Sequence, residues 1–411
     1  MEMGVSGQRK DWQGSQKMTF VEQDSQLPAG SCMMEPDRSI LPPSIMGVIG
    51  GGQLGRMMAI SARQMGYGVA VLEPTIDSPL GQIADIEINA TYDDKVALTT
   101  LLEQSDVVTY EFENVPYQAV RELGSLGYLP QGEVPLVITS HRLREKLAIE
   151  EAGYKVAPFL AVMSKDELRY AVGKIGYPCI LKTSSGGYDG KGQWVLRSDA
   201  DLPEVLGIAN ENEYVLEGFV NFSKEVSVIV TRSVNGDVQV FPVTENRHVN
   251  QILHVSIAPA RIDESLQVEA SGIAVGLIKK LDFVGTLAIE MFVTEEGLVI
   301  NELAPRPHNS GHWTIDGCTV SQFEQHVRAV CGLPLVKPEI LGYAVMVNIL
   351  GQHVDDALDM WKRPEFSDGK LHLYGKEEMK RNRKVGHINF VGSEWNEVET
   401  KVDRFLEGLS G

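Results

Sequence analysis

The segment VGTLAIEMFVTEEGLVINELAPRPHNSGHW, residues 284–313, decides how this chain is interpreted. Two apolar stretches flank the turn sequence Thr294–Gly297, and this pattern predicts a β-hairpin. Glu290 and Glu302 are 12 residues apart and symmetric about that turn. Pairing across the turn therefore places their carboxylates opposite each other on one face. A turn shifted by one residue places Asn301 opposite Glu290 instead.

The apolar residues of the hairpin indicate which face is buried. Phe292 and Ile300 are expected to share the face of the two glutamates, whereas Leu287, Ile289 and Met291 are expected on or toward the other side. Two opposed carboxylates repel each other unless a cation neutralises them. Magnesium is the natural candidate, because it binds one or two carboxylates together with phosphate oxygens. A pair of solvated glutamates is the alternative, and their apolar neighbours disfavour it.

An irregular polar segment follows the second strand of the hairpin. Arg306 suits a phosphoryl or carboxylate group, which its guanidinium can bind with two parallel hydrogen bonds. His308 and His312 have a spacing that zinc ligands use, but the prolines of this segment prevent a regular helix. The neighbouring carboxylates favour magnesium over zinc.

A second loop with chemical potential precedes the hairpin in the chain. An apolar strand ends at Lys182 and leads into SSGGYDGKG, residues 184–192, whose glycines leave backbone amides exposed. Such a loop can cover a polyphosphate, with Lys182 as a fixed cation and Lys191 as a second charge. A solvated glycine-rich hairpin explains the loop equally well. Farther on, EGFV at 217–220 can present backbone groups to adenine and Glu225 can bind ribose, but a plain strand also explains them.

The first glycine-rich loop admits three interpretations. Gly50, Gly52 and Gly55 form G-x-G-x-x-G between a strand and a helix, and Glu73 ends the next strand. This pattern is typical of nicotinamide dehydrogenases. The same glycines also serve a tight turn that only packs helix on strand, or a fold that binds a different phosphorylated ligand.

Five basic residues lie close together near the C-terminal strand VGHINF, in an otherwise acidic chain with a net charge of -19. Lys376, Lys380, Arg381, Arg383 and Lys384 form this cluster, which predicts either a phosphate clamp or a solvated charge run. No long Lys/Arg run is present, so a nucleic-acid partner is not expected.

Composition places the chain among globular, cytoplasmic proteins. No apolar run is long enough for a membrane span, and the four scattered cysteines include no CxxC pair, which is typical of a reduced compartment. Residues 1–44 are polar and aperiodic and are interpreted as a leader, so the folded part is expected to begin near Ser44. At least 1–33 are interpreted as a disordered leader or a misassigned start, with Met33 or Met34 as an alternative start.

Alternating strand and helix patterns predict a mixed α/β and α+β chain of several domains. A Rossmann-like N-terminal domain is expected at 45–140, a central domain at 141–337, and a small strand-rich domain at 338–411.

Taken together, the motifs resemble the ATP-grasp superfamily and, within it, the N5-carboxyaminoimidazole ribonucleotide synthetase family. The resemblance covers nearly all of the chain from about residue 40, and its motifs occur in the family's order. They are GGGQLGRMM (50–58), YEFENV (110–115), SSGGYDGKGQ (184–193), ENRHVNQILHVSIAPAR (245–261), NELAPRPHNSGHW (301–313), SQFEQH (321–326) and RKVGH (383–387). The segment KEEMKRNRKVGH is one residue longer than the family's usual form, which leaves Lys380 and Arg381 unassigned.

The resemblance implies a set of roles. The residues implied for ATP are Arg142, Lys182, Gly187, Tyr188, Asp189, Gly190, Lys191, Gly192, Gln193, Glu217, Gly218, Phe219, Val220, Glu225, His248, Asn301 and Glu302. Those implied for magnesium are Glu290 and Glu302, and those for the ribonucleotide are Gln53, Leu54, Glu111, Lys376, Arg383 and Lys384. Those implied for bicarbonate and catalysis are Tyr188, Asp189, Lys191, Arg306 and His308.

The implied enzyme is a carbon–nitrogen ligase of purine biosynthesis. Bicarbonate attacks the γ-phosphate of ATP to give carboxyphosphate, and the carboxyl unit is then captured by the exocyclic amine of 5-aminoimidazole ribonucleotide. Asp189 is a candidate for handling the amine proton. The family also implies a homodimer. Two rivals are an ATP-grasp enzyme that transfers another acyl group, such as formate, and a nicotinamide dehydrogenase; a third alternative is a non-catalytic nucleotide-binding homologue.

Overall fold

The computed structural model describes residues 39–186, 191–208 and 212–409. Its first part is a four-stranded parallel sheet in the order β3-β2-β1-β4, as the sequence predicts for a Rossmann-like domain. Apolar strands that are buried on both faces explain why helices cover the sheet. The elements are β1 (Ile45–Ile49), α2 (Gln53–Gln64), β2 (Gly68–Leu72), β3 (Ile86–Ile88), α3 (Lys95–Glu103), β4 (Val107–Tyr110), α4 (Tyr117–Leu126) and α5 (Val134–Thr139).

The packed chain begins earlier than the predicted Ser44. Ile40 is buried, its amide donates to the carbonyl of Cys331 at 2.8 Å, and its own carbonyl accepts from the hydroxyl of Tyr67 at 2.6 Å. Residues 39–44 therefore belong to the packed chain and not to a leader. The prediction for residues 1–38 lies outside the described residues.

A second, antiparallel sheet has the order β5-β8-β6-β7 and packs helices α7 and α8 against its apolar face. It carries Lys182 on β6 and Glu217 on β8, in neighbouring strands. The elements are α6 (Arg142–Glu151), β5 (Phe159–Val162), α7 (Lys165–Ile175), β6 (Cys179–Thr183), β7 (Gln193–Leu196), α8 (Leu202–Ile208) and β8 (Tyr214–Gly218).

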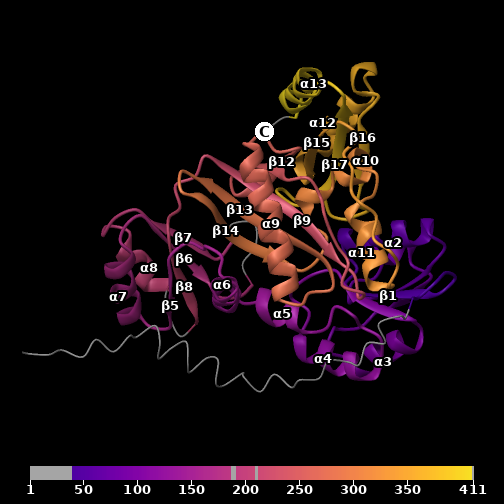
Figure 1. Cartoon of the computed structure of the whole chain (residues 1–411), viewed down its shortest axis with the longest axis horizontal. Helices are drawn as coiled ribbons and strands as arrows, with labels where there is room; N and C mark the ends of the chain where they lie inside the picture. The colour runs from indigo at the N-terminus through magenta and orange to yellow at the C-terminus, as the bar shows by residue number, and fades with distance from the viewer. Residues whose placement is uncertain (1–38, 187–190, 209–211, 410–411) are drawn as a thin grey trace, which may run out of the picture. The chain divides into compact units, whose positions relative to one another are not determined.

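The largest sheet is built from strands β9 to β17 (Figure 1). Its order is β14-β13-β9-β11-β12-β15-β17-β16, with β10 paired to β9, and α9 packs along the apolar face of β9, β13 and β14. The elements are β9 (Lys224–Arg232), β10 (Val238–Val240), β11 (Thr244–Val249), β12 (Ile252–Ala258), α9 (Glu264–Lys280), β13 (Gly285–Thr294), β14 (Gly297–Ala304), α10 (Thr314–Gly317) and α11 (Gln322–Val330).

The strand-rich C-terminal part extends this same sheet. Strand β15 pairs with β12, so the strands predicted as a separate domain continue the hydrogen-bonded ladder of the central one. The helices α12 and α13 cover its apolar face. The elements are β15 (Tyr343–Leu350), α12 (Val354–Trp361), β16 (Lys370–Leu373), β17 (Lys384–Gly392) and α13 (Trp395–Glu407).

The hairpin β13–β14 contains a β-bulge that the sequence did not predict. Thr294 pairs with Gly297 at the turn, and this register alone would place Asn301 opposite Glu290. Asn301 is instead the extra residue of the bulge, and Glu302 becomes the partner of Glu290. The predicted carboxylate pair is therefore confirmed.

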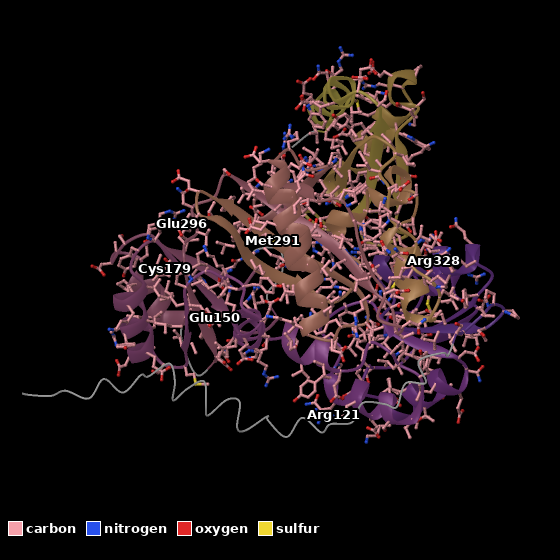
Figure 2. The ribbon with its side chains drawn as sticks, in the orientation of Figure 1. Arg121, Glu150, Cys179, Met291, Glu296 and Arg328 are labelled. Carbon is pink, nitrogen blue, oxygen red and sulfur yellow. The ribbon has the colours of Figure 1, made fainter. Side chains whose placement is uncertain are left out.

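The bulge also corrects one prediction about the faces. Ile300 pairs with Met291 and lies in the apolar core together with Leu303, so it does not share the glutamate face. Phe292 does lie outside that core and stacks on Phe222 with ring centroids 4.6 Å apart. Figure 2 shows the hairpin with Met291 and Glu296 labelled.

Candidate active site

Glu290 and Glu302 lie opposite each other at the polar face of the large sheet. The side chain of Glu290 is 16% exposed and that of Glu302 is 43% exposed. Burial, and then the charge of Glu302, raises the pKa of Glu290 to about 7. Two carboxylates held this close form a site that favours a cation.

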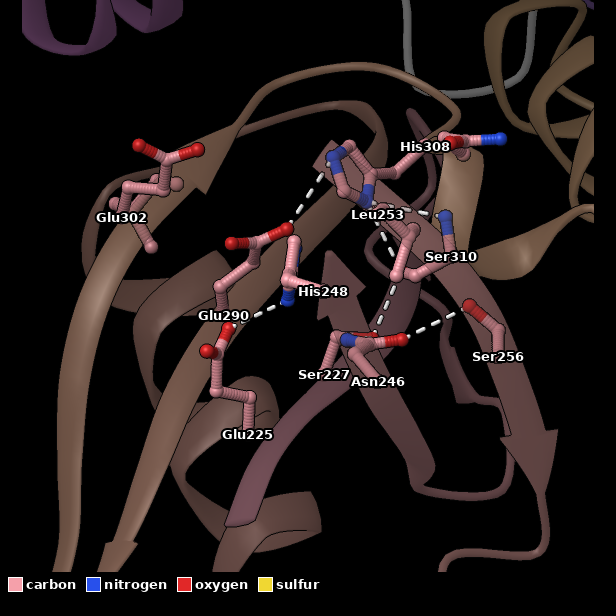
Figure 3. Close-up of polar contacts among 12 residues, drawn as sticks. Glu225, Ser227, Asn246, His248, Leu253, Ser256, Glu290, Glu302, His308 and Ser310 are labelled. Atoms are coloured by element: carbon pink, nitrogen blue, oxygen red, sulfur yellow. Dashed lines mark hydrogen bonds and ion pairs between the residues drawn. The ribbon is translucent and has the colours of Figure 1, made fainter. Parts of the chain in front are cut away.

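The side chain of His308 points toward Glu290 (Figure 3). Its Nδ1 accepts from the amide of Ser310 at 3.3 Å, so Nε2 carries the proton and lies 3.5 Å from Oε1 of Glu290. A buried chain of hydroxyl and amide groups, Ser310–Ser227–Asn246–Ser256, holds the ring in place at distances of 2.7 to 2.9 Å. Burial, and then the charges of Arg306 and Lys384, holds the pKa of His308 well below its usual value. The imidazole is therefore a neutral donor.

A second acid–histidine pair lies on the neighbouring strands. Nδ1 of His248 on β11 is 2.8 Å from Oε2 of Glu225 on β9. Burial works to lower the pKa of His248, but Glu225 outweighs it and the pKa is raised. The structure thus brings two of the residues expected near ATP into direct contact.

Two ammonium groups share one buried carboxylate at the edge of the small sheet. Oε2 of Glu217 is 2.9 Å from Nζ of Lys182 and 3.2 Å from Nζ of Lys146. All three residues are at most 8% exposed. Burial works to raise the pKa of Glu217, but the two lysines outweigh it and lower the pKa. Burial lowers the pKa of Lys182, although Glu217 acts to raise it. With both lysines protonated, the cluster has one net positive charge, which suits a phosphate.

Helix α6 joins this cation cluster to the carboxylates. Nη1 of Arg142 lies 3.5 Å from Oε2 of Glu302, and Oε1 of Glu145 accepts from the amide of Leu303 at 2.6 Å. Burial, and then Glu302, raises the pKa of Glu145 to about 8. The sequence interpretation missed Lys146 and Glu145. Their spacing of three and four residues from Arg142, which places all three on one helix face, was the available signal.

Arg306 makes a two-pronged ion pair with Glu113. Its Nε lies 2.6 Å from Oε2 and its Nη2 donates to Oε1 at 3.1 Å. Burial works to lower the pKa of Arg306, but Glu113 outweighs it and the pKa is raised. Glu113 was also missed by the sequence interpretation.

The first glycine-rich loop is closed by the protein's own carboxylates. Glu111 accepts from the amides of Gly52 and Gly55, and Glu73 accepts from the amide of Gly51 at 2.8 Å. Burial raises the pKa of Glu111. A pyrophosphate at this helix terminus would meet a carboxylate in place of open amides, so the geometry argues against the nicotinamide interpretation.

Gly50 provides a test of this closed loop. Its φ of +104° is strained for other residues, and an added Cβ would lie 2.5 Å from Cγ of Glu111. Gly50→Ala is expected to destabilise the fold by about 2 kcal/mol or more. Gly124→Ala in α4 is the matched control, because no atom lies within 4 Å of the added Cβ. Urea unfolding of both variants measures the difference, and equal stabilities would contradict the prediction.

The C-terminal basic cluster divides into two groups. Nζ of Lys376 donates to the carbonyl of Lys384 at 2.7 Å, whereas Arg383 contacts Glu378. The charge of Lys384 contributes to lowering the pKa of Glu290, although burial raises that pKa overall. It acts in the same direction on His308, after burial and Arg306. Lys384 therefore belongs to the carboxylate and histidine side of the site.

The loop that bears Lys376 also lies next to helix α2, which follows the first glycine-rich loop. The carbonyl of Gly375 accepts from Gln82 at 2.7 Å, and Gln82 accepts from Arg56 on α2 at 3.1 Å. Leu54, in the first turn of α2 beside Gln53, shares an apolar cluster with Tyr374. These contacts connect helix α2, which bears Gln53 and Leu54, with the loop that bears Lys376. Both segments carry residues that are expected to bind the ribonucleotide.

Some of the residues expected to bind ATP lie outside the described residues, and others are described mainly by their backbone contacts. Gly187, Tyr188, Asp189 and Gly190 lie outside the described residues. Gly192 adopts a left-handed conformation, with φ of +73°, where strands β6 and β7 meet, and Gln193 pairs with Lys182. Next to Glu217, the amides of Gly218 and Phe219 donate to Pro158 and Pro178, and β8 ends before Val220.

The two histidines of the zinc alternative make different contacts. The described ranges contain no group of three or more histidine, cysteine or acidic side chains that could hold a metal ion. His308 contacts Glu290, whereas His312 packs against His387 with ring centroids 4.9 Å apart.

Among the described residues, no helix is long and apolar enough to cross a membrane.

Comparisons with known proteins agree with this geometry. A model of the ATP-grasp domain matches residues 147–323. The ribonucleotide synthetase preATP-grasp domain matches 44–132, and the phosphoribosylaminoimidazole carboxylase C-terminal domain matches 344–401. The N5-carboxyaminoimidazole ribonucleotide synthase of Bacillus subtilis strain 168 is 52% identical over 354 residues, which are 86% of this chain and 92% of that protein.

Solved structures give the same result. An ADP complex of an N5-carboxyaminoimidazole ribonucleotide synthetase is 53% identical, with a TM-score of 0.88 and coverage of 90% of this chain and 98% of the other. The Aspergillus clavatus enzyme in complex with ADP and 5-aminoimidazole ribonucleotide is 29% identical, with a TM-score of 0.83 and coverage of 89% and 98%. The chain belongs to the N5-carboxyaminoimidazole ribonucleotide synthase family.

Proposed function

We propose that this protein carboxylates the exocyclic amine of 5-aminoimidazole ribonucleotide with ATP and bicarbonate, in purine biosynthesis. The products are N5-carboxyaminoimidazole ribonucleotide, ADP and phosphate. One observation carries the proposal: helix α6 bears both Arg142, which contacts Glu302 of the Glu290–Glu302 pair, and Lys146, which belongs to the buried Lys146–Glu217–Lys182 cluster. A carboxylate pair beside a cation cluster is what a triphosphate with a divalent cation requires.

ATP is proposed to lie between the small sheet and the large sheet. Lys182 and Arg142 offset phosphate charge, and the segment Glu217–Val220 borders the adenine. The contact of Glu225 with His248 orients both side chains for the ribose. Asn301 and Glu302, and the loop residues Lys191, Gly192 and Gln193, complete the proposed ATP site.

Magnesium fits the carboxylate pair. The raised pKa of Glu290, caused by burial and by Glu302, reflects a repulsion that a divalent cation relieves. Glu290 and Glu302 are the proposed ligands, together with phosphate oxygens. When bound, the ion offsets the negative charge of the transferring phosphoryl group.

The first chemical step joins bicarbonate to the γ-phosphate. An oxygen of bicarbonate forms a bond to phosphorus as the bond to the ADP oxygen breaks, which gives carboxyphosphate. Arg306 orients the anion through its guanidinium, and the protonated Nε2 of His308 donates a hydrogen bond to it. Because carboxyphosphate hydrolyses readily, the buried position of both side chains limits the access of water.

In the second step the exocyclic amine of the ribonucleotide bonds to the carboxyl carbon, the bond from that carbon to the phosphate oxygen breaks, and the departing phosphate takes up the amine proton. Gln53, Leu54 and Glu111 are proposed to border the ribonucleotide at the glycine-rich loop. Lys376, Arg383 and Lys384 are proposed to bind its phosphate. The helix-to-loop contacts among Arg56, Gln82 and Gly375 support this placement, since they connect the two groups.

The domain bounds, the cellular location and the oligomeric state of the protein are also proposed. The proposed domains are 45–140, 141–337 and 338–411. The protein is proposed to act in the cytoplasm and as a homodimer, as the resemblance to the family implies. These two features stay predictions.

An ADP-release assay tests the function directly. ADP release is expected to depend on Mg-ATP and to rise at least about tenfold when 5-aminoimidazole ribonucleotide and bicarbonate are both present. A response to formate and glycinamide ribonucleotide, with none to 5-aminoimidazole ribonucleotide, would overturn the proposal in favour of another acyl transfer. Thermal stabilisation by NADH and not by Mg-ATP would favour a dehydrogenase.

A further inference from the structure

Glu113 holds Arg306 by one defined edge. The carboxylate contacts Nε and Nη2, which form one edge of the planar guanidinium. A guanidinium has a second edge, between Nη1 and Nη2, that can bind another planar anion. Within the described residues, Nη1 makes only one long contact, at 3.4 Å, to the carbonyl of Pro307.

Both partners of this ion pair are held in one frame. Gln131 is buried, donates to the carbonyl of Pro305 at 3.3 Å, and accepts from Thr109 and from the amide of Tyr110 on β4. The residue before Arg306 and the strand that leads to Glu113 are therefore tied to the same amide side chain. Gln131 therefore holds the backbone next to Arg306 in place relative to the strand that leads to Glu113.

Other carboxylates compete for Arg306. After Glu113, the charges of Glu302 and Glu111 also act to raise the pKa of Arg306, although burial opposes them. Without Glu113, the guanidinium would be drawn toward either one. Pairing with Glu302 would occupy a proposed magnesium ligand, and pairing with Glu111 would disturb the carboxylate that closes the glycine-rich loop.

We propose that Glu113 is a positioning residue that holds the Nε–Nη2 edge of Arg306 and leaves the Nη1–Nη2 edge for bicarbonate and the carboxyphosphate formed from it. This inference rests on the proposed function. Glu113 does not touch the reacting atoms; it acts through Arg306. The same contact links the segment that bears Glu111, at the proposed ribonucleotide site, to the carboxylation site.

The test compares Glu113→Gln with Glu133→Gln in the bicarbonate dependence of ADP release. Glu133 is the matched control, because it also pairs with an arginine, Arg121, at 2.7 Å, and neither residue is among those proposed to bind a substrate. For Glu113→Gln the bicarbonate concentration at half-maximal rate is expected to rise about tenfold or more, with the KM for ATP within about twofold of wild type. Glu133→Gln is expected to match wild type.

A double-mutant cycle separates positioning from a merely structural role. Lysine cannot present a two-pronged edge, so Arg306→Lys removes the feature that Glu113 orients. Adding Glu113→Gln to Arg306→Lys is therefore expected to change the bicarbonate response by less than about twofold. Glu113→Asp, which keeps the charge on a shorter side chain, is expected to give an intermediate response, and it decides the question if Glu113→Gln does not fold.

Three results would overturn the inference. They are an unchanged bicarbonate response in Glu113→Gln and Glu113→Asp, an equal change in Glu133→Gln, or full additivity of Glu113→Gln with Arg306→Lys. A wild-type protein that releases no ADP with these substrates contradicts the proposed function itself, and the inference falls with it. That outcome is recognised before any variant is compared.

Discussion

Replacing Glu302 with glutamine is expected to lower ATP turnover by about a hundredfold to a thousandfold while the fold persists. Glu302 faces Glu290 in the ladder, and its own partner is Arg142 at 3.5 Å. Glutamine keeps the shape of the side chain but removes the charge that the proposed divalent cation requires. Because the side chain of Glu302 is 43% exposed, losing the Arg142 contact costs only about 0–1 kcal/mol.

The measurement pairs ADP release with thermal unfolding. Glu296→Gln is the matched control, since Glu296 lies at the exposed turn of the same hairpin and its side chain has no ion pair in the described residues. The control is expected to keep wild-type turnover and stability. Glu302→Gln is expected to unfold near the wild-type temperature without ligand, and to lose the stabilisation that Mg-ADP gives the wild type. Near-normal turnover in Glu302→Gln would refute the magnesium assignment.

Local patterns in the sequence were sufficient to predict that Glu290 pairs with Glu302. They were not sufficient to predict the β-bulge that brings these two residues opposite each other. The symmetry of Glu290 and Glu302 about the turn predicted their pairing, and the ladder confirms it. The bulge at Asn301, which makes that pairing possible, depends on how the strand fits the core through Ile300 and Leu303. Turn chemistry alone does not reveal such a fit, and the face of Ile300 was therefore predicted wrongly.

Long-range partners account for the residues that were missed. Glu113 and Arg306 are separated by 193 positions, and no local pattern connects them. Lys146 was overlooked because a lysine in a helix is usually solvated, whereas here it is 2% exposed against Glu217. By contrast, the parallel N-terminal sheet followed from alternating apolar strands and helices, since that pattern is local.

Removing the charge of Glu217 is expected to produce the second large effect, on stability. Its carboxylate is the only ion-pair partner of Lys146 and Lys182 among the described residues. Glu217→Gln leaves two buried ammonium groups without compensation, and this is expected to destabilise the fold by about 3–5 kcal/mol. Urea unfolding in the absence of nucleotide measures the loss.

A second substitution tests whether charge is the cause. Lys146→Met in the Glu217→Gln background removes one of the two cations, so it is expected to recover at least about half of the lost stability. Exposed pairs elsewhere supply the control: Glu122→Gln, which breaks the contact with Lys95, is expected to cost no more than about 1 kcal/mol. A loss as small in Glu217→Gln, or no recovery on removing Lys146, would show that Glu217 does not hold the two lysines in place. If the loss and its recovery are both observed, the cluster carries a surplus positive charge in the folded protein, and a triphosphate is the chemical group that such a surplus favours.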